Sequence, residues 1–411
     1  NYMEKFYKII LIALSLAICS GLFSQTTTPQ RPKDFSSMPV VKWKFKAQQP
    51  FISSPVVDGE TIYAGNLDGY LYAINLKSGE LKWKFKTNGE IRSNPNVTDN
   101  TIFLISGDGN LYAIDKNTQK PMWIFNASDK QYDTNDYHQS SPILYNNVLY
   151  FGMGDGKVYA VNSTDGKEIW SYQTGDVVHS TPAILKEKLY IGSFDGNVYG
   201  FEAANGNLLW KFKTVGHSYF PKGEVQFSPT PVNITVYIAA RDYNLYAIDF
   251  EKGVCRWNRE FPPGWATSIT HLPERDSLIL LSTSDPRHLY CINRANEKTY
   301  WQANLKSQAF GKCALSENMC YTGTVMGKLF GIDVSTGEIK WVFSTEGYNK
   351  NHLKYFTSED EYRDDIFSII KTDKDYLDMV YSCGAIFSTS AITDNEIIFS
   401  SAEGIIYCLG R

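Results

Sequence analysis

The sequence lacks several features that would place it in common functional classes. After its first 25 residues, no segment is apolar enough to cross a lipid bilayer, so the mature chain is expected to have no transmembrane span. The net charge is −4, and lysine and arginine gather in no basic stripe, which argues against nucleic acid as a partner. The seven cysteines show none of the spacings of a zinc site, so no metal is predicted.

Catalytic motifs are missing as well. The chain has no serine–histidine–aspartate order, no paired-carboxylate motif and no glycine-rich loop that would cradle a phosphate. His138 and His179 are single histidines without a placed partner, so neither is given a catalytic role. The sequence therefore assigns no catalytic, cofactor-binding or metal-binding residue, and it favours a non-enzymatic protein without deciding the question.

The first 24 residues have the pattern of a secretory signal peptide. Lys5 and Lys8 precede an apolar run over residues 9–18 that is too short to span a bilayer, and small and polar residues follow. Cleavage after Ser24 would leave a soluble chain that starts with a linker at 25–39. Lipidation of Cys19 is the alternative, although Ile18 is a poor match to the usual small residue before such a cysteine. Both routes predict export to the periplasm, either as a soluble protein, which is slightly favoured, or tethered to the outer membrane.

Aromatic residues are abundant, at 14% of the chain, and the tryptophans recur with a regular period. Successive members of the series lie 40 to 47 residues apart, and only Trp265 falls outside it. Self-similarity with a period of this length is typical of β-propellers and solenoids. We predict that these side chains dock one repeat against the next; they are Trp43, Trp83, Trp123, Trp170, Trp210, Trp257, Trp301 and Trp341.

Each repeat contains four short strands joined by tight turns. In the first complete unit, the strands are predicted at 53–57, 61–65, 70–75 and 81–86. The third strand contains LYAIN, and variants of this pattern recur in every later unit. Asp-Gly pairs between second and third strands supply the positive φ angles that tight hairpins need. Four alternating strands joined by hairpins form an antiparallel meander, which is one blade of a propeller.

The strands at the two ends of the chain complete each other. A lone fourth strand at 41–46 opens the repeat region, and a unit that lacks its fourth strand ends it with IYCLG at 406–410. An open ring would expose two unpaired edges, so pairing these strands satisfies their backbone groups. The sequence therefore predicts an all-β, eight-bladed β-propeller of four-stranded antiparallel blades over residues 40–411, closed by the N-terminal strand.

The cysteines of the propeller region are predicted to be mostly part of the core. Cys291 and Cys408 occupy the alanine position of the third-strand pattern, where any small residue fits. Cys313 and Cys320 flank Ser316-Glu317, and a two-residue turn there would place them opposite each other. This pair is predicted to be either a disulfide or two small buried thiols.

The segments LYAINLKSGELKW at 71–83 and LFGIDVSTGEIKW at 329–341 resemble the tryptophan-docking motif of quinoprotein (PQQ)-like propellers. The resemblance covers residues 41–411. This family includes quinone-dependent alcohol dehydrogenases and non-enzymatic BamB-like lipoproteins, which assist outer-membrane protein assembly. The chain has no adjacent cysteine pair and no equivalent of the enzymes' metal ligands or catalytic aspartate, so it is similar to the BamB-like branch. The resemblance thus implies no cofactor, with PQQ and Ca²⁺ expected only if the chain is an oxidoreductase.

Long loops between blades are the first candidate binding site, because variable loops on a rigid scaffold often carry function. They cover residues 126–138, 213–225 and 344–385, the last being an insertion between blades 7 and 8. In the insertion, the acidic stretch 359–365 favours a solvated helical cap over a calcium site. The alternative is that the loops only cover their own apolar residues. The candidate binding residues on the loops are Tyr137, His138, His217, Tyr219 and Phe220.

The mouth of the central channel is the second candidate site. The residues three places before the proline of each first strand, with the last three blades aligned less securely, are Ile52, Arg92, Gln139, His179, Gln226, Ala266, Phe310 and Phe387. The four polar residues come from consecutive blades, so they are expected side by side, facing an apolar half. They could bind a small polar or anionic ligand or a peptide side chain; the alternative is a water-filled channel.

These observations predict a non-enzymatic, BamB-like scaffold of the cell envelope that recognises a protein or peptide on the long-loop face. Two alternatives remain open. The first is a PQQ-dependent oxidoreductase, and the second is a propeller that binds a carbohydrate or another small ligand through its loop aromatics.

Overall fold

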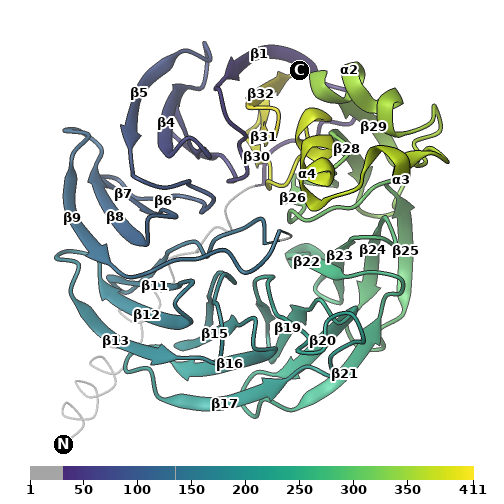
Figure 1. The fold of residues 1–411 in the computed structure, drawn as a ribbon. Helices are drawn as coiled ribbons and strands as arrows, with labels where there is room; N and C mark the ends of the chain where they lie inside the picture. Colours follow the sequence, from purple (N-terminus) through teal and green to yellow (C-terminus); the bar gives the residue numbers. More distant parts are fainter. Residues whose placement is uncertain (1–30, 135) are drawn as a thin grey trace, which may run out of the picture.

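Eight four-stranded antiparallel sheets surround a central axis in the computed structural model, which describes residues 31–134 and 136–411 (Figure 1). The predicted eight-bladed propeller is therefore confirmed. The predicted signal peptide and the candidate lipidation site Cys19 lie outside the described residues.

The strands follow one another from the axis to the rim of each blade. Blades 1 and 2 are β2 (Val56–Asp58), β3 (Thr61–Gly65), β4 (Tyr70–Asn75), β5 (Leu81–Lys86), and β6 (Asn96–Val97), β7 (Thr101–Ile105), β8 (Asn110–Asp115), β9 (Pro121–Asn126). Blades 3 and 4 are β10 (Ile143–Tyr145), β11 (Val148–Gly152), β12 (Lys157–Asn162), β13 (Glu168–Gln173), and β14 (Ala183–Leu185), β15 (Lys188–Gly192), β16 (Asn197–Glu202), β17 (Leu208–Lys213). Blades 5 and 6 are β18 (Thr230–Val232), β19 (Thr235–Ala239), β20 (Asn244–Asp249), β21 (Cys255–Glu260), and β22 (Ala266–His271), β23 (Leu278–Thr283), β24 (His288–Asn293), β25 (Thr299–Asn304), with a 3₁₀ turn η1 (Pro273–Arg275) in blade 6. Blades 7 and 8 are β26 (Ala314–Leu315), β27 (Met319–Gly323), β28 (Lys328–Asp333), β29 (Ile339–Ser344), and β30 (Ala391–Ile392), β31 (Glu396–Ser401), β32 (Ile405–Gly410) with β1 (Val40–Lys46).

The Asp-Gly turns are held by hydrogen bonds to the strand that follows them. In blade 1, the Asp68 carboxylate accepts the backbone N–H of Tyr70 at 2.9 Å and the hydroxyl of Tyr72 at 2.7 Å. Gly69 has φ +78°, which a residue without a Cβ adopts at no steric cost. Each hairpin is thus specified by its own local sequence. The same Asp–Tyr bond recurs at Asp108–Tyr112, Asp155–Tyr159, Asp195–Tyr199 and Asp242–Tyr246.

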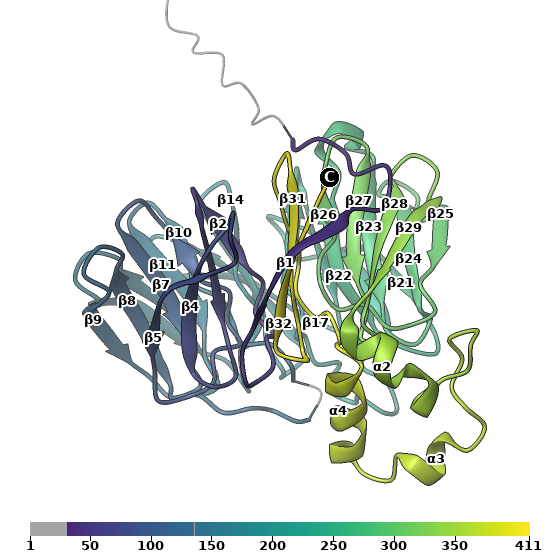
Figure 2. The same ribbon diagram turned by 90° about the horizontal axis from the view of Figure 1, so that it is seen from above.

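The N-terminal strand closes the ring as predicted. β1 pairs antiparallel with β32, from Val40 opposite Gly410 to Lys46 opposite Ile405. Figure 2 shows the purple strand β1 lying beside the yellow strand β32. The blade built from both chain ends therefore leaves no open edge between the first and last repeats.

The repeating tryptophans dock each blade onto the next one. The indole N–H of Trp43, in blade 8, donates to the Leu76 carbonyl of blade 1 at 2.9 Å. Its ring covers Gly79, where a Cβ would lie 2.6 Å from the indole. The tryptophan can therefore pack here only because the turn carries a glycine. The corresponding bonds are Trp123 to Ser163, Trp170 to Ala203, Trp210 to Phe250, Trp257 to Arg294, and Trp301 to Val334.

Residues 31–39, predicted as part of a linker, pack against blade 7. The Trp341 indole N–H donates to the carbonyl of Phe35 at 2.6 Å. In other blades the docking tryptophan meets the turn before the fourth strand of the next blade. Blade 8 has no such turn, because its third and fourth strands come from opposite ends of the chain, and Phe35 takes its place. Phe35 is 2% exposed, and its N–H donates to the Tyr321 hydroxyl. The Asp34 carboxylate accepts the backbone N–H groups of Asn318 and Met319. This segment therefore completes the tryptophan contact between blades 7 and 8.

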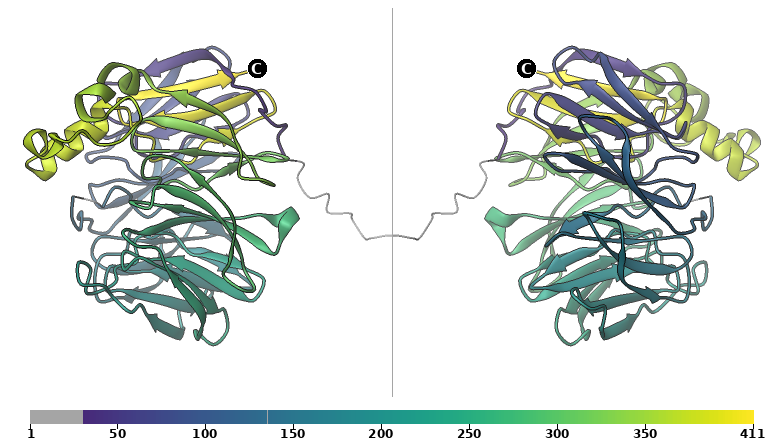
Figure 3. Two further views of the ribbon diagram at one scale, coloured as in Figure 1. Left: turned by 90° about the vertical axis from the view of Figure 1, so that its right-hand side faces the viewer. Right: turned by 90° about the vertical axis from the view of Figure 1, so that its left-hand side faces the viewer.

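The 344–385 segment forms a helical cap on one face of the ring (Figures 2 and 3). It contains α2 (Glu346–Tyr355), α3 (Ile366–Ile369) and α4 (Asp373–Ser382). The acidic stretch lies between α2 and α3, outside any helix, and its carboxylates pair with basic side chains, for example Asp360 with Lys328. Across the two described ranges, no group of three or more His, Cys, Asp or Glu side chains could hold a metal ion.

The prediction that Cys313 and Cys320 lie opposite each other is wrong. Cys320 pairs with Leu315, and the Ser316 N–H donates to the Met319 carbonyl at 3.0 Å. The two-residue turn is therefore Glu317-Asn318, one residue later than predicted, and the register is shifted accordingly. Both cysteines are buried free thiols. Cys291 and Cys408 lie in the core at the alanine position, as predicted. In the described part of the chain, no helix combines the length and apolarity that a bilayer crossing requires.

The Trp43 contact generates the first prediction. We expect Trp43→Ala to lower the free energy of unfolding by about 3–5 kcal/mol, because it removes the wedge between blades 8 and 1. Val40→Ala on the same strand is the control, since Val40 is 62% exposed, and its cost should stay within about 0.5 kcal/mol. Urea unfolding followed by fluorescence and circular dichroism measures both; equal stability of the two variants would contradict the docking role.

Candidate functional site

Equivalent positions of the eight first strands line the central channel in two rings. Val56 in blade 1 lies opposite Tyr63, which pairs with the alanine position of the third strand. Thr270, Ala314 and Ala391 have the equivalent strand pairing in blades 6, 7 and 8, so the eight first strands can be aligned residue by residue. The mouth ring lies four residues before this place and consists of Ile52, Arg92, Gln139, His179, Gln226, Ala266, Phe310 and Phe387. The inner ring lies two residues before it and consists of Ser54, Asn94, Ser141, Thr181, Ser228, Ser268, Lys312 and Thr389.

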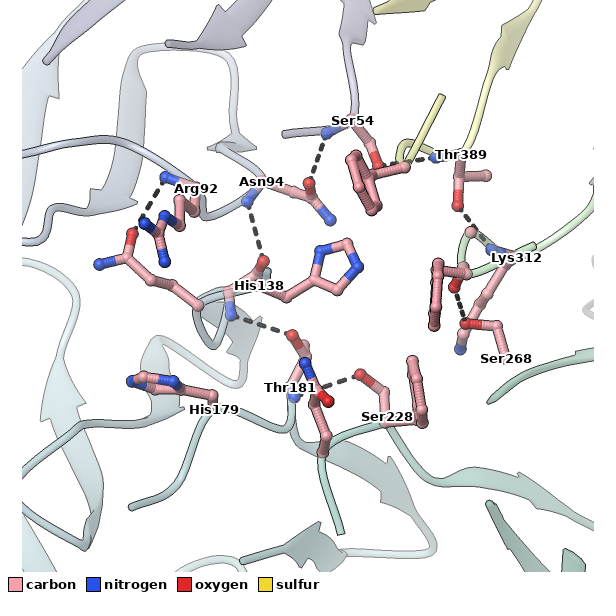
Figure 4. A pocket seen from close by; sticks show the side chains of 17 residues that line it. Ser54, Arg92, Asn94, His138, His179, Thr181, Ser228, Ser268, Lys312 and Thr389 are labelled. Carbon is pink, nitrogen blue, oxygen red and sulfur yellow. Dashed lines mark hydrogen bonds between the residues drawn. The ribbon is translucent and has the colours of Figure 1, made fainter. Parts of the chain in front are cut away.

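The two rings enclose an axial cavity of about 110 Å³ (Figure 4). The whole inner ring lines it, together with six side chains from the mouth region. Four of those six are the polar residues predicted for one half of the mouth, and Phe310 and Phe387 represent the apolar half. His138, from the loop after blade 2, also points into this cavity (Figure 4). The structure thus gathers Arg92, Gln139, His179, Gln226 and His138 around one small space.

The polar half of the mouth is already engaged by the acidic loop between blades 2 and 3. The His179 ring lies 2.9 Å from the Asp129 carboxylate and 2.7 Å from that of Asp136. The Arg92 guanidinium donates to the Asp136 carbonyl at 3.1 Å. Gln139 donates to Asp129 at 2.6 Å. These mouth residues therefore bind the chain's own acidic loop. That loop occupies the position where the sequence predicted an external polar or anionic ligand.

Arg241, in the turn between β19 and β20 of blade 5, holds the same acidic loop in place. Its side chain is fully buried, forms an ion pair with Asp133, and donates to the Gln226 side chain at 3.0 Å. The guanidinium also lies 4.7 Å from the ring centre of Trp265. A buried arginine with a carboxylate, an amide and aromatic faces around it is well compensated. This cluster fixes the position of the loop over the channel.

The two histidines of the site have opposite electrostatic surroundings. Burial alone would lower the pKa of His179, but the carboxylates of Asp136 and Asp129 outweigh it and raise that pKa to about 9. For His138, burial lowers the pKa to about 4, and Arg92 and His179 lower it further against the effect of Asp136. At neutral pH, His179 is therefore a cation that binds the acidic loop, whereas His138 is a neutral ring facing the cavity.

Tyr137 closes the mouth above the cavity. Its ring is 3% exposed and lies 4.5 Å from the ring centre of Phe387 and 5.6 Å from that of Phe310. Tyr376 of α4 lies within hydrogen-bonding reach of Tyr137. Burial raises the pKa of both tyrosines; their contact raises the pKa of Tyr376 further and lowers that of Tyr137 against the larger effect of burial. Tyr137 was predicted as a binding residue, and the structure places it as the cover of the channel.

A second and larger pocket, of about 390 Å³, lies beside this cover on the long-loop face. Tyr219 is 77% exposed at its rim, and Phe220 packs edge-on against Trp265 at 5.2 Å. The His217 ring packs at a tilt against Tyr243, with ring centres 4.1 Å apart, and so supports the rim. We name this site the aromatic pocket; its lining is Tyr137, Tyr219, Phe220, Tyr243, Trp265, Ser284, Asp285, Gln308, Phe310 and Tyr376.

Several residues of both sites were missed by the sequence analysis. Trp265 was the tryptophan outside the repeating series, and that departure was a signal that it serves another purpose. The acidic residues Asp129, Asp133 and Asp136 lie in a loop that was considered only for its aromatics. Arg241 carried no signal, because its burial depends on a loop more than a hundred residues away. Lys312 was passed over because the sequence analysis considered only the mouth position of each first strand, which in blade 7 is Phe310, two residues earlier.

Comparison with protein families gives one match along most of the chain. The family model described as outer membrane protein assembly factor BamB matches residues 41–219, 177–271 and 263–367. No curated protein is similar enough in sequence to count as a match.

Solved structures with the same fold include both designed and natural proteins. The computationally designed Ika8 protein has 12% sequence identity and a TM-score of 0.69, with 90% of this chain and 100% of that one covered. BamB from Moraxella catarrhalis has 13% identity and a TM-score of 0.52, covering 90% and 88%. Quinohemoprotein alcohol dehydrogenase from Comamonas testosteroni has 11% identity and a TM-score of 0.67, covering 90% and 76%. At these identities the likeness concerns the fold alone, and a fold shared by an enzyme and an assembly factor does not decide between activities.

The ion pairs of His179 generate the second prediction. Because its pKa is raised in the folded protein, its contribution to stability is complete below the unfolded pKa of about 6.5 and is lost as the pH rises through about 9. We expect the free energy of unfolding to fall by about 3 kcal/mol over this range. His179→Gln should remove this part of the pH dependence, whereas the loop variant His217→Gln should retain it. Urea unfolding between pH 6 and pH 10 measures the slope, and an unchanged slope in His179→Gln would contradict a protonated His179.

Proposed function

The chain belongs to the family of the outer membrane protein assembly factor BamB, and from this premise we propose that it is a non-enzymatic scaffold of the cell envelope. In this proposal it recognises a protein or peptide on the long-loop face, through the aromatic pocket. The observation that carries the proposal is that pocket: its volume of about 390 Å³ suits side chains or a short segment, whereas the axial cavity, at about 110 Å³, offers less than a third of that space.

The chemistry of the aromatic pocket supports recognition of an apolar or aromatic segment. Seven of its ten lining residues are aromatic, and Tyr219 already presents its ring to solvent. Tyrosine and tryptophan supply large contact areas with little loss of conformational entropy, which is why they dominate binding hot spots. Asp285 and Gln308 add polar groups at the pocket wall that could bind a peptide backbone. The ring beneath is rigid, so the pocket is largely preformed.

The proposed location follows from the family and from the N-terminal sequence. We propose that residues 1–24 direct export and that the propeller works in the periplasm or at the outer membrane. A lipid on Cys19 would hold it at the membrane, and cleavage after Ser24 would release it. Either form would present the long-loop face to a partner in the same compartment.

A quinone-dependent oxidoreductase is the second candidate, favoured by the likeness of the fold to the quinohemoprotein enzyme. The residues around the two cavities do not fit pyrroloquinoline quinone. This quinone carries three carboxylates, and the axial cavity of about 110 Å³ is too small for it, while the cationic Arg92 and His179 there are engaged by the acidic loop. The aromatic pocket is large enough, but its lining has an aspartate and no lysine, arginine or histidine. We therefore derive no redox step through this cofactor.

Photo-crosslinking tests the partner site directly. We expect a benzoylphenylalanine placed at position 219 to form one covalent adduct of defined mass in the native cell envelope, identified by mass spectrometry. The matched control is the same residue at position 300, because Tyr300 is also exposed, at 62%, but lies on the outer strand β25. With the purified partner, Tyr219→Ala should weaken binding by about 2 kcal/mol, or about 30-fold, and Tyr300→Ala should leave it unchanged.

Three outcomes would contradict the proposal. Adducts of the same protein at both positions would mean that the contact is not specific to the pocket. No adduct at position 219 would leave the pocket without a macromolecular partner. Competition of the adduct by soluble oligosaccharides, together with their binding to the isolated protein, would assign the pocket to a carbohydrate instead.

Thermal unfolding tests the oxidoreductase alternative. We expect pyrroloquinoline quinone with calcium to leave the Tm unchanged relative to calcium alone, because neither cavity combines the size and positive charge that this ligand needs. A saturable rise in Tm, accompanied by dye-linked oxidation of an alcohol or sugar, would replace the scaffold proposal with the enzymatic one.

A further inference from the structure

Lys312 is the exception among the eight residues of the inner ring. Seven blades place a serine, threonine or asparagine at this position, and blade 7 places a lysine there. The side chain lines the axial cavity, and Figure 4 shows it among the ring residues that surround His138. A lysine in an otherwise short and uncharged ring brings a positive charge to the axis of the propeller.

The polar side chains of the inner ring are arranged as hydrogen-bond donors toward the cavity. Six of the seven use the side-chain oxygen to accept a backbone N–H from the neighbouring blade, which occupies one lone pair of that oxygen. The acceptor oxygens belong to Ser54, Asn94, Ser141, Thr181, Ser228 and Thr389, and the donors are the backbone N–H groups of Thr389, Ser54, Asn94, Ser141, Thr181 and Lys312 in the same order. The hydroxyl protons and the Asn94 amide protons are not used in these bonds and are available to the cavity that these residues line.

Lys312 interrupts this chain of bonds because an ammonium group cannot accept a hydrogen bond. The ring residue of the preceding blade, Ser268, instead donates to the Phe310 carbonyl at 2.6 Å. The Lys312 Nζ has one hydrogen-bond contact in the described chain, to the Thr230 hydroxyl at 3.5 Å, which is long for such a bond. Burial lowers the pKa of Lys312, which reflects the cost of keeping this charge inside the channel.

No carboxylate lines the cavity among the described residues, so Lys312 has no internal counter-ion there. The other cations of the lining, Arg92 and His179, are bound to the acidic loop. His138 is neutral at physiological pH and adds a ring N–H donor at the centre of the cavity (Figure 4). The cavity therefore combines one half-buried lysine, without a carboxylate in the lining, and a surrounding set of donors.

We propose that the inner ring is a binding site for a small monovalent anion, of the size of chloride or bromide, held by Lys312. The volume of about 110 Å³ accommodates such an ion with a few waters, since one water takes about 30 Å³ of liquid volume. A single charge is specified because one ammonium balances one negative charge, and a dianion would leave an excess charge buried. This site differs from the aromatic pocket, so the inference does not depend on the proposed function.

Bromide binding tests the site in two ways. In solution, sodium bromide should raise the Tm of the full chain in a saturable manner relative to sodium gluconate at the same ionic strength, because gluconate is too large for the cavity. In crystals soaked with bromide, anomalous diffraction should show a peak in contact with the Lys312 Nζ. Sodium chloride should compete with bromide at this position.

Two substitutions separate the site from non-specific salt effects. Lys312→Thr gives blade 7 the residue type found in the other blades, so we expect it to fold and to lose at least tenfold in bromide affinity. Lys312→Met is a second variant that removes the charge while retaining the length of the side chain. Lys211→Thr is the matched control, because Lys211 is exposed on β17, and it should respond to bromide like the wild type.

The proposal is overturned if Lys312→Thr and Lys312→Met retain the wild-type bromide response. It is equally overturned if the crystals show no anomalous peak at Lys312. A peak without a saturable shift in solution would mean binding at crystal concentration only, and this too would reject a site that works in the protein's own environment.

Discussion

The contact between each tryptophan and the next blade is the interaction on which the rest of the structure depends. An indole lies over a glycine turn and donates its N–H to a carbonyl beside that turn, so the spacing between blades is set by a contact with little tolerance. Adding a Cβ at Gly79 would bring it to 2.6 Å from Trp43, which shows how closely the two surfaces approach. Because the contact repeats around a closed ring, a change in the spacing between two blades would require the other blades to shift as well.

The same regularity explains how much of the molecule was predictable from its sequence. Strands, hairpins and closure are specified locally, by alternating side chains, by Asp-Gly turns such as Asp68-Gly69, and by the unpaired edge that β1 covers. The polar half of the mouth was predictable for the same reason, since Arg92 and His179 occupy equivalent places on neighbouring blades. The turn between Cys313 and Cys320 was not, because it lies one residue later than its local sequence suggested, and hairpin register depends on the strand pairing around the turn.

What the sequence could not predict are the contacts between loops that are distant in the chain. Asp133 and Arg241 meet only because the loop after blade 2 crosses the ring to the turn of blade 5. Similarly, Tyr376 reaches Tyr137 only because the helical insertion folds back over the axis. Neither pairing leaves a periodic pattern, and each depends on the path of an irregular segment. The repeat therefore defines the scaffold, and its irregular segments define the surface that a partner would meet.

The arrangement of charge also explains why we propose the aromatic pocket, rather than the polar mouth, as the partner site. A ligand entering the mouth would have to displace the acidic loop and leave His179 and Arg241 as buried charges without their carboxylates. Breaking buried ion pairs in this way costs about 3–5 kcal/mol for each pair, which a new contact would first have to offset. The aromatic pocket carries no such cost, because Tyr219 and its neighbours present apolar surface to water before any partner arrives. Covering that surface is favourable from the first contact, since it removes apolar area from water without breaking an existing bond.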